Sequence, residues 1–406
     1  MNRGIFQTLL SPTGQEIILA ALDLEPRESD FLRHFTTLNR KYSSDLARAA
    51  LEIAILRTEG SVKFPFADRL YFTRPALEQA SNYGISSYRA MRYHDFDRII
   101  DLGCSIGGDT IALAVVAPTY GVDLDPLRLA MAQVNLTALD LAERTTFIQG
   151  DLASAFFFSL PASSALFFDP SRRTMERRIY SVNEYQPPLN VIESWLKICP
   201  ALGVKISPGV RLEEIRLYDA EVEFISLRGE LKEAVLWFGP LKTTQRRATL
   251  LSGSSELDIK TSYTMTASTG RSKEQSFPLS EPLDYLYEPD PAILRAGLVR
   301  ELGEQLDAAQ LDPDIAYLTS HKLIKTPFAR AWRIESWHPF GVKRLRALLR
   351  QRGVGKVTVK KRGSPLQPES LIHDLHLEKE GSLNPTERVL FLTHLRGRPI
   401  VVVCFP

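Results

Sequence analysis

The first 92 residues repeat apolar side chains at the three- and four-residue spacing of helices. The segment 45–57 shows this most clearly, because its apolar side chains share one helical face: Leu46, Ala49, Ala50, Ile53 and Leu56. Another helix is predicted within 72–92, where Thr73 is a typical N-cap and Pro75 fits the first turn. We therefore expect residues 1–92 to form a small helical domain.

The pattern changes after residue 92. From 93 to 251, apolar runs of strand length alternate with helical stretches, as in a parallel sheet covered by helices. This order predicts a doubly wound, Rossmann-like α/β domain. The next segment, 252–289, is polar and rich in turn residues, so we expect a linker or a long loop.

A second mixed region occupies 290–406. The pattern predicts a helix over 290–306, a strand over 329–337 and a helix over 341–353 that ends at Gly353. A strand (356–362), a short helix (368–375) and two closing strands, VLFLTHL and PIVVVCF, follow. The order strand–helix–strand–helix–strand–strand predicts a small α+β domain.

Composition narrows the class of protein. The 406 residues suffice for two or three domains, and the net charge of +2 means that any nucleic-acid site must be local. Cys104, Cys199 and Cys404 form neither a zinc motif nor a disulfide framework, so we expect no metal and a reducing, cytoplasmic location. The N-terminus does not resemble a secretion signal, and no apolar run approaches the ~18–20 residues of a membrane span.

The candidate chemistry lies in the middle domain. Residues 97–116 read DRIIDLGCSIGGDTIALAVV, a buried strand, a glycine-rich turn and a helix. Such a turn is the first nucleotide-binding element of a doubly wound sheet, and its glycines let a ligand approach the main chain. A dinucleotide site would need G-x-G-x-x-G to seat a pyrophosphate, but the run from Gly103 to Gly108 lacks the middle glycine.

Acidic residues on both sides of this turn indicate the kind of ligand. Asp101 precedes the first glycine and Asp109 follows the last. Two carboxylates repel a pyrophosphate and favour a cationic ligand without phosphate. S-adenosyl-L-methionine, which has an ammonium and a sulfonium group, is such a ligand and is the cofactor we predict.

Three further acids follow successive predicted strands. Asp123 lies 22 residues after Asp101, about where a second-strand carboxylate binds ribose hydroxyls. Asp151 follows an apolar strand and can accept a hydrogen bond from the adenine amino group, and Asp169 ends a fourth strand. Because ligands of open α/β sheets bind at the carboxyl ends of strands, we expect these acids to meet at one edge.

The motifs DLGCSIGGDT, GVDLDP, GDL and FFDPSRR resemble, in this order, the motifs of class I S-adenosylmethionine-dependent methyltransferases. Five more segments are similar to bacterial THUMP-like methyltransferases: KFPFADRLYFTRPALEQAS (63–81), YQPPL (185–189), VKISPGV (204–210), SLRGELKEAVLWFG (226–239) and VTVKKRG (357–363). The resemblance covers most of the chain beyond about residue 40. It implies a methyltransferase domain and a C-terminal THUMP-like, ferredoxin-like α+β domain over 290–406. The THUMP name points to RNA, tRNA or rRNA, as the partner.

The resemblance also implies roles for residues. Those assigned to the cofactor are Asp101, Gly103, Cys104, Gly107, Gly108, Asp109, Asp123, Leu124, Asp151 and Leu152. Those assigned to the methyl acceptor are Asp169, Pro170, Ser171 and Arg172. The motif departs from the DPPY type, because Arg172 replaces the aromatic residue that stacks on a base. Tyr180 or Tyr185 is a candidate substitute.

A nitrogen or oxygen is the predicted acceptor atom. Methylation of a pyrimidine carbon would need a nucleophilic cysteine, and 204–210 offers Ser207 and Pro208 instead. Asp169 can accept a hydrogen bond from an acceptor amine, and whether it also takes the proton stays open. Arg172 and Arg173 either anchor a phosphate or carboxylate of the substrate or form salt bridges within the chain.

One segment of the C-terminal region is strongly basic. Between Lys322 and Arg362 there are 13 Lys or Arg residues and one acid, Glu335. The interleaved aromatic residues are Phe328, Trp332, Trp337 and Phe340. This combination is typical of nucleic-acid binding, and the alternative is a solvated helix face with the tryptophans in the core. The predicted substrate-binding residues are Arg173, Lys343, Arg344 and Arg346.

Other functions stay open at this point. The chain could bind the cofactor and RNA without transferring a methyl group. It could also methylate a small molecule or a protein, with the C-terminal domain serving assembly only. The turn sequence disfavours nicotinamide-dependent redox chemistry.

Overall fold

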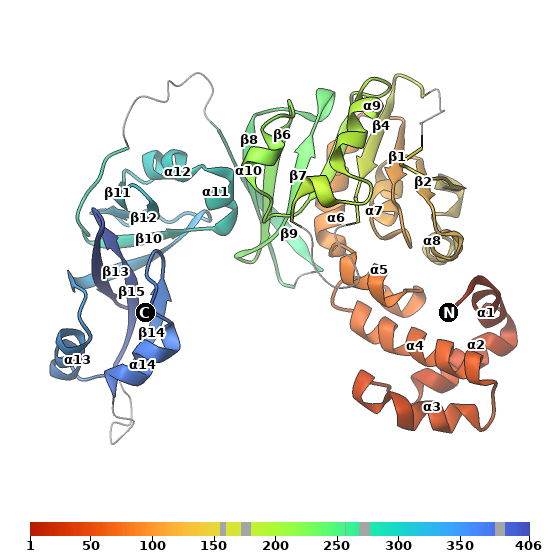
Figure 1. Ribbon diagram of the computed structural model, residues 1–406, viewed down its shortest axis with the longest axis horizontal. Coiled ribbons are helices and arrows are strands. Elements are labelled where there is room, and N and C mark those ends of the chain that lie inside the picture. Colours follow the sequence, from red (N-terminus) through yellow and green to blue (C-terminus); the bar gives the residue numbers. More distant parts are fainter. Residues whose placement is uncertain (155–159, 172–179, 256, 268–276, 378–385) are drawn as a thin grey trace. The chain divides into compact units, whose positions relative to one another are not determined.

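A computed structural model describes residues 1–154, 160–171, 180–255, 257–267, 277–377 and 386–406 (Figure 1). The chain divides into two compact units. Unit 1 comprises residues 1–223, 232–245 and 251–262, and unit 2 comprises residues 224–231, 246–250 and 263–406. The domain boundaries expected at residues 92, 251 and 289 stay predictions.

The N-terminal region is helical, as expected. Its helices are α1 Arg3–Leu9, α2 Pro12–Leu22, α3 Phe31–Asn39, α4 Ser44–Gly60, α5 Arg74–Gln79 and α6 Tyr83–Ala90. The predicted cap of α5 is confirmed, because the Ala76 main-chain N donates a hydrogen bond of 3.3 Å to the Thr73 Oγ1. In the described part of the chain, no helix has the length and apolar character that crossing a membrane requires.

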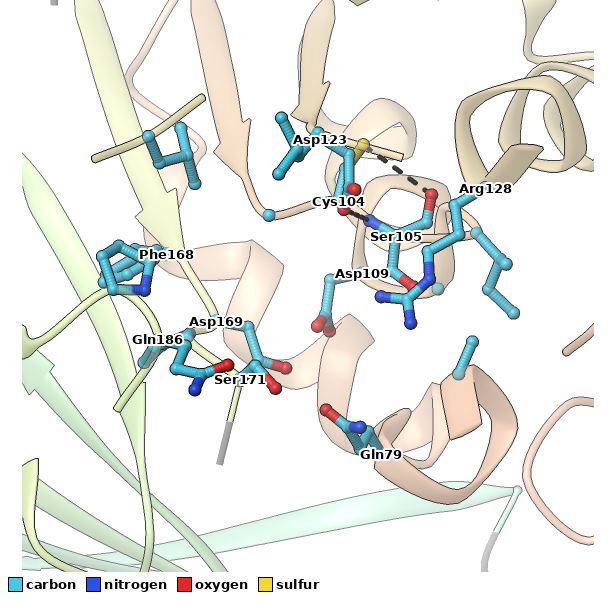
Figure 2. A pocket seen from close by; sticks show the side chains of 18 of the residues that line it. Gln79, Cys104, Ser105, Asp109, Asp123, Arg128, Phe168, Asp169, Ser171 and Gln186 are labelled. Atoms are coloured by element: carbon cyan, nitrogen blue, oxygen red, sulfur yellow. Dashed lines mark hydrogen bonds between the residues drawn. The ribbon is translucent and has the colours of Figure 1, made fainter. Parts of the chain in front are cut away.

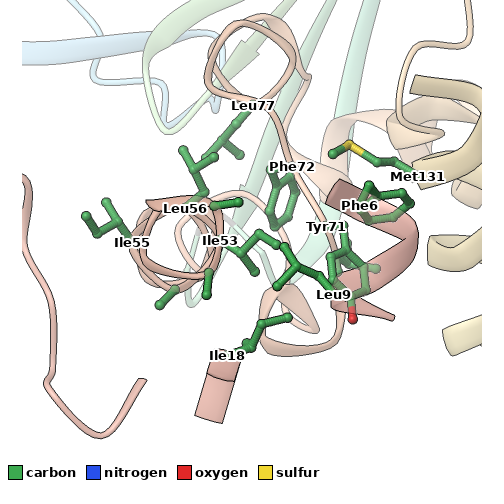
Figure 3. Packing of buried hydrophobic residues seen from close by; sticks show 14 of the residues in the cluster. Phe6, Leu9, Ile18, Ile53, Ile55, Leu56, Tyr71, Phe72, Leu77 and Met131 are labelled. Carbon is green, nitrogen blue, oxygen red and sulfur yellow. The ribbon is translucent and has the colours of Figure 1, made fainter. Parts of the chain in front are cut away.

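The apolar faces of these helices build one core. Phe6 and Leu9 of α1 converge with Ile53 and Leu56 of α4, and all four are buried (Figure 3). Met131 belongs to the same core although it comes from α8 Pro126–Ala138, a helix of the Rossmann-like region. The helical region is therefore packed firmly against the α/β part of unit 1.

A nine-stranded sheet follows, in the order β3-β2-β1-β4-β5-β7-β6-β8-β9. Its strands are β1 Arg98–Leu102, β2 Thr119–Asp123, β3 Thr145–Gln149, β4 Ser164–Phe168, β5 Leu202–Ile206, β6 Glu221–Leu227, β7 Glu230–Trp237, β8 Arg246–Gly253 and β9 Ile259–Thr266. The pairs among β1–β5 are parallel, and β7 is antiparallel to β5. The doubly wound α/β prediction is confirmed. The strand order reverses between β1 and β4, which is where such sheets bind ligands.

The interpretation of 252–289 as a linker or loop was wrong in two places. This segment contains β9 and most of its side chains are exposed, apart from Met265. It also contains β10 Tyr285–Pro289. An edge strand with two solvated faces has the polar composition of a loop, so the hydrophobic pattern does not reveal it.

The second sheet has seven strands in the order β11-β12-β10-β13-β16-β15-β14. The remaining elements of this region are α11 Pro291–Ala296, α12 Val299–Gln305, β11 Ala309–Asp312, β12 Ile315–Ser320, β13 Ala329–Pro339, α13 Val342–Gln351, β14 Val354–Lys361, α14 Pro368–Leu375, β15 Thr386–Leu395 and β16 Arg398–Cys404. The single helix predicted over 290–306 is two helices, because Gly297 adopts a left-handed φ of 65° between them.

The predicted order strand–helix–strand–helix–strand–strand from β13 to β16 is confirmed. It gives an α+β domain whose connectivity differs from the βαββαβ order of a ferredoxin-like domain. Helices α13 and α14 pack on one face of the sheet, where Leu345, Leu349 and Leu371 join Leu390 and Val403 in a buried cluster.

Candidate active site

A cavity of about 560 Å³ opens in unit 1, where the chain leaves the carboxyl ends of β1, β2, β3 and β4 (Figure 2). Its volume lies within the ~300–1,000 Å³ range of small-molecule sites. The lining residues are Ala76, Gln79, Ala80, Gly103, Cys104, Ser105, Ile106, Gly108, Asp109, Asp123, Leu124, Arg128, Gly150, Asp151, Leu152, Ala153, Phe168, Asp169, Pro170, Ser171, Gln186, Pro187 and Pro188.

The structure brings most of the predicted site residues to this cavity. Asp101 and Gly107 are the predicted cofactor residues that do not line it. Asp169, Pro170 and Ser171 line it together with the cofactor candidates, whereas Arg172 and Arg173 lie outside the described residues. Four successive strand ends therefore meet at one site, as the spacing of the acids predicts.

The glycine-rich turn has a backbone that a side chain would disturb. Gly103 has a φ of 83°, and a Cβ there would lie 3.2 Å from the main-chain O of Asp169. The Gly103 N and the Cys104 N donate hydrogen bonds of 2.8 and 3.0 Å to the main-chain O of Val122. The turn is thus held against β2 and within reach of the loop after β4.

Asp123 is fixed at the mouth of β2. The main-chain N of Ser105 donates to its Oδ2 and that of Asp125 donates to its Oδ1, each at 2.9 Å. These bonds use two of the roughly four acceptor positions of a carboxylate. Asp123 is buried yet lines the cavity, so its remaining positions can serve a ligand.

Asp109 has a different environment. Its carboxylate pairs with the guanidinium of Arg89, which is itself buried and pairs also with Glu233. Burial acts to raise the pKa of Asp109, but Arg89 and Lys205 outweigh it, so this pKa lies below its usual value. Asp109 is therefore an ionised group at the cavity.

Asp101 is buried beneath the site. Its Oδ2 accepts a hydrogen bond of 2.6 Å from the Thr110 hydroxyl, and its exposed fraction is 1%. Burial, followed by repulsion from Asp109, raises the pKa of Asp101 to about 8. The sequence places Asp101 at the methionine end of the cofactor, whereas in the structure it lies one layer below the residues that line the cavity.

One wall of the cavity, which includes Asp169, is built from two loops. Ser171 and Gln186 exchange main-chain hydrogen bonds of 3.2 and 3.1 Å, which join the loop after β4 to residues 185–188. Phe168, Pro170 and Pro187 supply an apolar wall. Figure 2 shows Asp169, Ser171 and Gln186 side by side on this wall, with Gln79 on another element of the cavity.

Of the two tyrosines considered as stacking partners, Tyr185 cannot reach a base. Its exposed fraction is 1%, and its hydroxyl accepts a hydrogen bond of 3.0 Å from the Ser207 main-chain N. Tyr180 is about half exposed. Only Tyr180 stays a candidate.

Sequence reasoning missed several lining residues. Gln79 comes from α5, in the region interpreted only as a helical domain, and Gln186 from a loop. Arg128, in the first turn of α8, is the cation among the described residues that line the cavity. Arg128 follows Asp123 by five residues, and a zwitterionic ligand needs a cation for its carboxylate, so the sequence did contain a signal for this lining residue.

The basic segment of unit 2 is largely engaged within the fold. Arg346 is half-buried and donates to the main-chain O of Asp374, and Arg352 and Arg388 pair with Glu335. Phe328 and Trp332 are buried, and Trp337 and Phe340 are partly buried against the apolar clusters, which favours the alternative interpretation. Lys343 and Arg344 are exposed on α13.

Comparisons with known proteins agree with this fold. Residues 96–183 match the family model described as RNA cap guanine-N2 methyltransferase, and residues 329–406 match the model described as THUMP domain-like. Residues 3–59 match a domain of unknown function. A crystal structure of a protein from Porphyromonas gingivalis W83, designated a methyltransferase, has a TM-score of 0.76 at 21% identity; the similarity covers 96% of this chain and 98% of that one.

The fold is thus that of a class I methyltransferase. The chain is 32% identical over 313 residues to an S-adenosylmethionine-dependent methyltransferase of Mycobacterium tuberculosis. The aligned region covers 75% of this chain and 81% of that protein. It belongs to this family of S-adenosylmethionine-dependent methyltransferases, with a THUMP-like domain at its C-terminal end. Over 96 residues it is also 33% identical to trimethylguanosine synthase of Schizosaccharomyces pombe, covering 22% of this chain and 40% of that protein.

Proposed function

We propose that this methyltransferase methylates a nitrogen of an RNA base. The observation that carries the proposal is Asp169, which directly follows β4 and lines the same cavity as Asp109, Asp123 and Asp151. The match of residues 96–183 to the guanine-N2 methyltransferase model and the likeness to trimethylguanosine synthase support an amino nitrogen as the acceptor. The THUMP-like match supports RNA as the substrate class.

The residues of the cavity fit S-adenosylmethionine. Asp109 and the main chain at Gly103 would hold the methionine end, with Arg128 facing its carboxylate. Asp123 would bind the ribose and Asp151 the adenine amino group. Carboxylates without a phosphate cradle suit a ligand that carries cationic groups and no phosphate.

When bound, S-adenosylmethionine supplies a methyl carbon that bonds to the acceptor nitrogen while the electron pair of the carbon–sulfur bond stays on sulfur. Asp169 would accept a hydrogen bond from the amine and so orient the nitrogen lone pair toward the methyl carbon that is transferred. Phe168, Pro170 and Pro187 would pack against the base and hold it in place. The amine proton can leave to water after transfer, so no protein base is required.

The test uses tritiated S-adenosylmethionine with total cellular RNA, total protein and small-molecule extracts as separate acceptors. We expect label in RNA, and we expect Asp169→Asn to lower its rate of incorporation by roughly 10²-fold, because misplacing the acceptor removes alignment. Asp219→Asn is the matched control, since Asp219 is exposed and pairs with Lys242 outside the cavity lining. Label that enters protein or small molecules but not RNA would contradict the proposal.

A further inference from the structure

Lys205 is a buried lysine beside the acceptor loop. It lies in β5, whose Val204 is the register partner of Phe168 in the parallel pair β4–β5, so Lys205 and Asp169 occupy adjacent positions at the strand ends. The side chain of Lys205 is 2% exposed, and its Nζ lies 2.5 Å from the Oδ2 of Asp169. From the sequence, this strand is notable only for the absence of a cysteine.

Such a lysine is costly for the fold. Removing an ammonium from water carries a large free-energy penalty, which attraction to one carboxylate does little more than compensate. Apolar replacements of buried ion pairs are often as stable as the pairs. The neighbours of Lys205 in β5, Val204 and Ile206, are fully buried apolar residues. The ion pair with Asp169 therefore points to a role in the cavity rather than in stability.

The position of the ammonium restricts what Asp169 can do. Lys205 engages Oδ2, and the described residues offer no hydrogen-bond partner to Oδ1. A carboxylate paired with a buried ammonium has part of its negative charge offset. It can still accept a hydrogen bond through the free oxygen.

We propose that Lys205 is a positioning residue, which fixes Asp169 through Oδ2 and offsets its charge, so that the free Oδ1 can accept a hydrogen bond from the acceptor amine. This inference rests on the proposed role of Asp169 in the methyl transfer. The pair also adds no net charge to the site, because one ammonium offsets one carboxylate next to the space where a sulfonium is expected.

The balance can be measured without any acceptor. S-adenosylmethionine carries the sulfonium charge, and S-adenosylhomocysteine does not. Lys205→Met leaves the charge of Asp169 uncompensated, so we expect the preference for S-adenosylmethionine over S-adenosylhomocysteine to rise by about 3- to 10-fold. Asp169→Asn leaves the ammonium uncompensated and should lower the preference by a similar factor.

The experiment measures the dissociation constants of both compounds by calorimetry at pH 7.5, on the full chain. Lys205→Arg should keep the wild-type ratio, because the cation remains, and the double variant Lys205→Met with Asp169→Asn should return to it, because both charges are gone. Lys242→Met is the matched control, since Lys242 pairs with Asp219 and does not line the cavity. A merely structural lysine would change both dissociation constants together and leave their ratio unchanged.

A ratio within twofold of wild type in Lys205→Met would overturn the proposal. If that variant does not fold, Asp169→Asn decides in the same way, because an unchanged ratio there also overturns it. The outcome does not depend on RNA: a protein that shows the expected ratios but labels no RNA would contradict the proposed function and leave the role of Lys205 standing.

Discussion

At the scale of single residues, the acids of the motifs differ far more in the structure than in the sequence. Asp123 is held by two main-chain N–H groups, Asp109 pairs with buried Arg89, and Asp101 is buried near Asp109 and accepts a hydrogen bond from the Thr110 hydroxyl. The same residue type thus provides a fixed acceptor, an ionised group and an acid with a raised pKa. Environment, not identity, separates these roles.

Asp101 gives a prediction about pH. The folded chain holds its proton up to about pH 8, whereas the unfolded chain releases it near pH ~4. Between these values the folded state binds the extra proton, so the Asp101 contribution to stability falls as pH rises. Asp101→Asn removes this titration and keeps the shape. We expect the free energy of unfolding of the variant, relative to wild type, to increase by at least about 1 kcal/mol from pH 5.5 to pH 8.5.

Urea denaturation of both proteins at the two pH values, without cofactor, measures this difference. Asp97→Asn is the control, because Asp97 lies just before β1 and is exposed. A difference between Asp101→Asn and wild type that stays constant with pH would refute the assignment.

At the scale of elements, the glycine-rich turn between β1 and α7 Gly108–Val116 lies close to the loop that follows β4. An alanine at Gly103 would combine backbone strain at a φ of 83° with a Cβ only 3.2 Å from the main-chain O of Asp169. We expect Gly103→Ala to weaken binding of S-adenosylhomocysteine by at least about 10-fold, because a small displacement spoils aligned contacts. Calorimetry measures the loss.

Gly229→Ala is a matched control for the strain alone. Gly229 has a φ of 82°, and a Cβ there would meet no atom within 4 Å. Both variants should lose similar stability in thermal unfolding, and only Gly103→Ala should lose affinity. Equal affinities in the two variants would show that the close approach to Asp169 is unimportant.

The elements also show what the sequence could predict. Strands β1–β4 and the turns after them follow from local pattern and spacing, and so does the meeting of their acids at one edge. Lys205 lies 36 residues after Asp169 in the sequence and Gln79 lies 90 residues before it, yet both reach the same site. No local sequence pattern indicates such long-range proximity. Strand β9 escaped prediction because its solvated side chains carry no hydrophobic alternation.

At the scale of the whole molecule, the basic segment shows why counting charges overstates a binding surface. Lys360 pairs with Glu288, Lys356 with Glu387, and Lys322 with Asp307. Arg330 and Lys360 both lie over the ring of Trp332, at 4.6 and 4.7 Å from its centroid. Most of the cations of this segment therefore have partners within the chain, and the proposed RNA surface narrows to the exposed side of α13.

The resulting prediction concerns Lys343 and Arg344. Both are exposed on α13, whereas Arg346 on the same helix holds the C-terminal end of α14 through the Asp374 carbonyl. If α13 contacts RNA, reversing both charges should lower the affinity for total cellular RNA by at least about 10-fold at low salt. It should also reduce the slope of log affinity against log salt by about 1–2, since each lost phosphate contact removes about one unit. Filter binding at several salt concentrations measures both quantities.

Reversal of Arg40 and Lys41, an exposed adjacent pair in unit 1, changes the net charge equally and controls for it. Affinity for S-adenosylhomocysteine should stay at the wild-type value in both double variants. Equal losses of RNA affinity from the two pairs would mean that net charge, and not the α13 surface, governs binding.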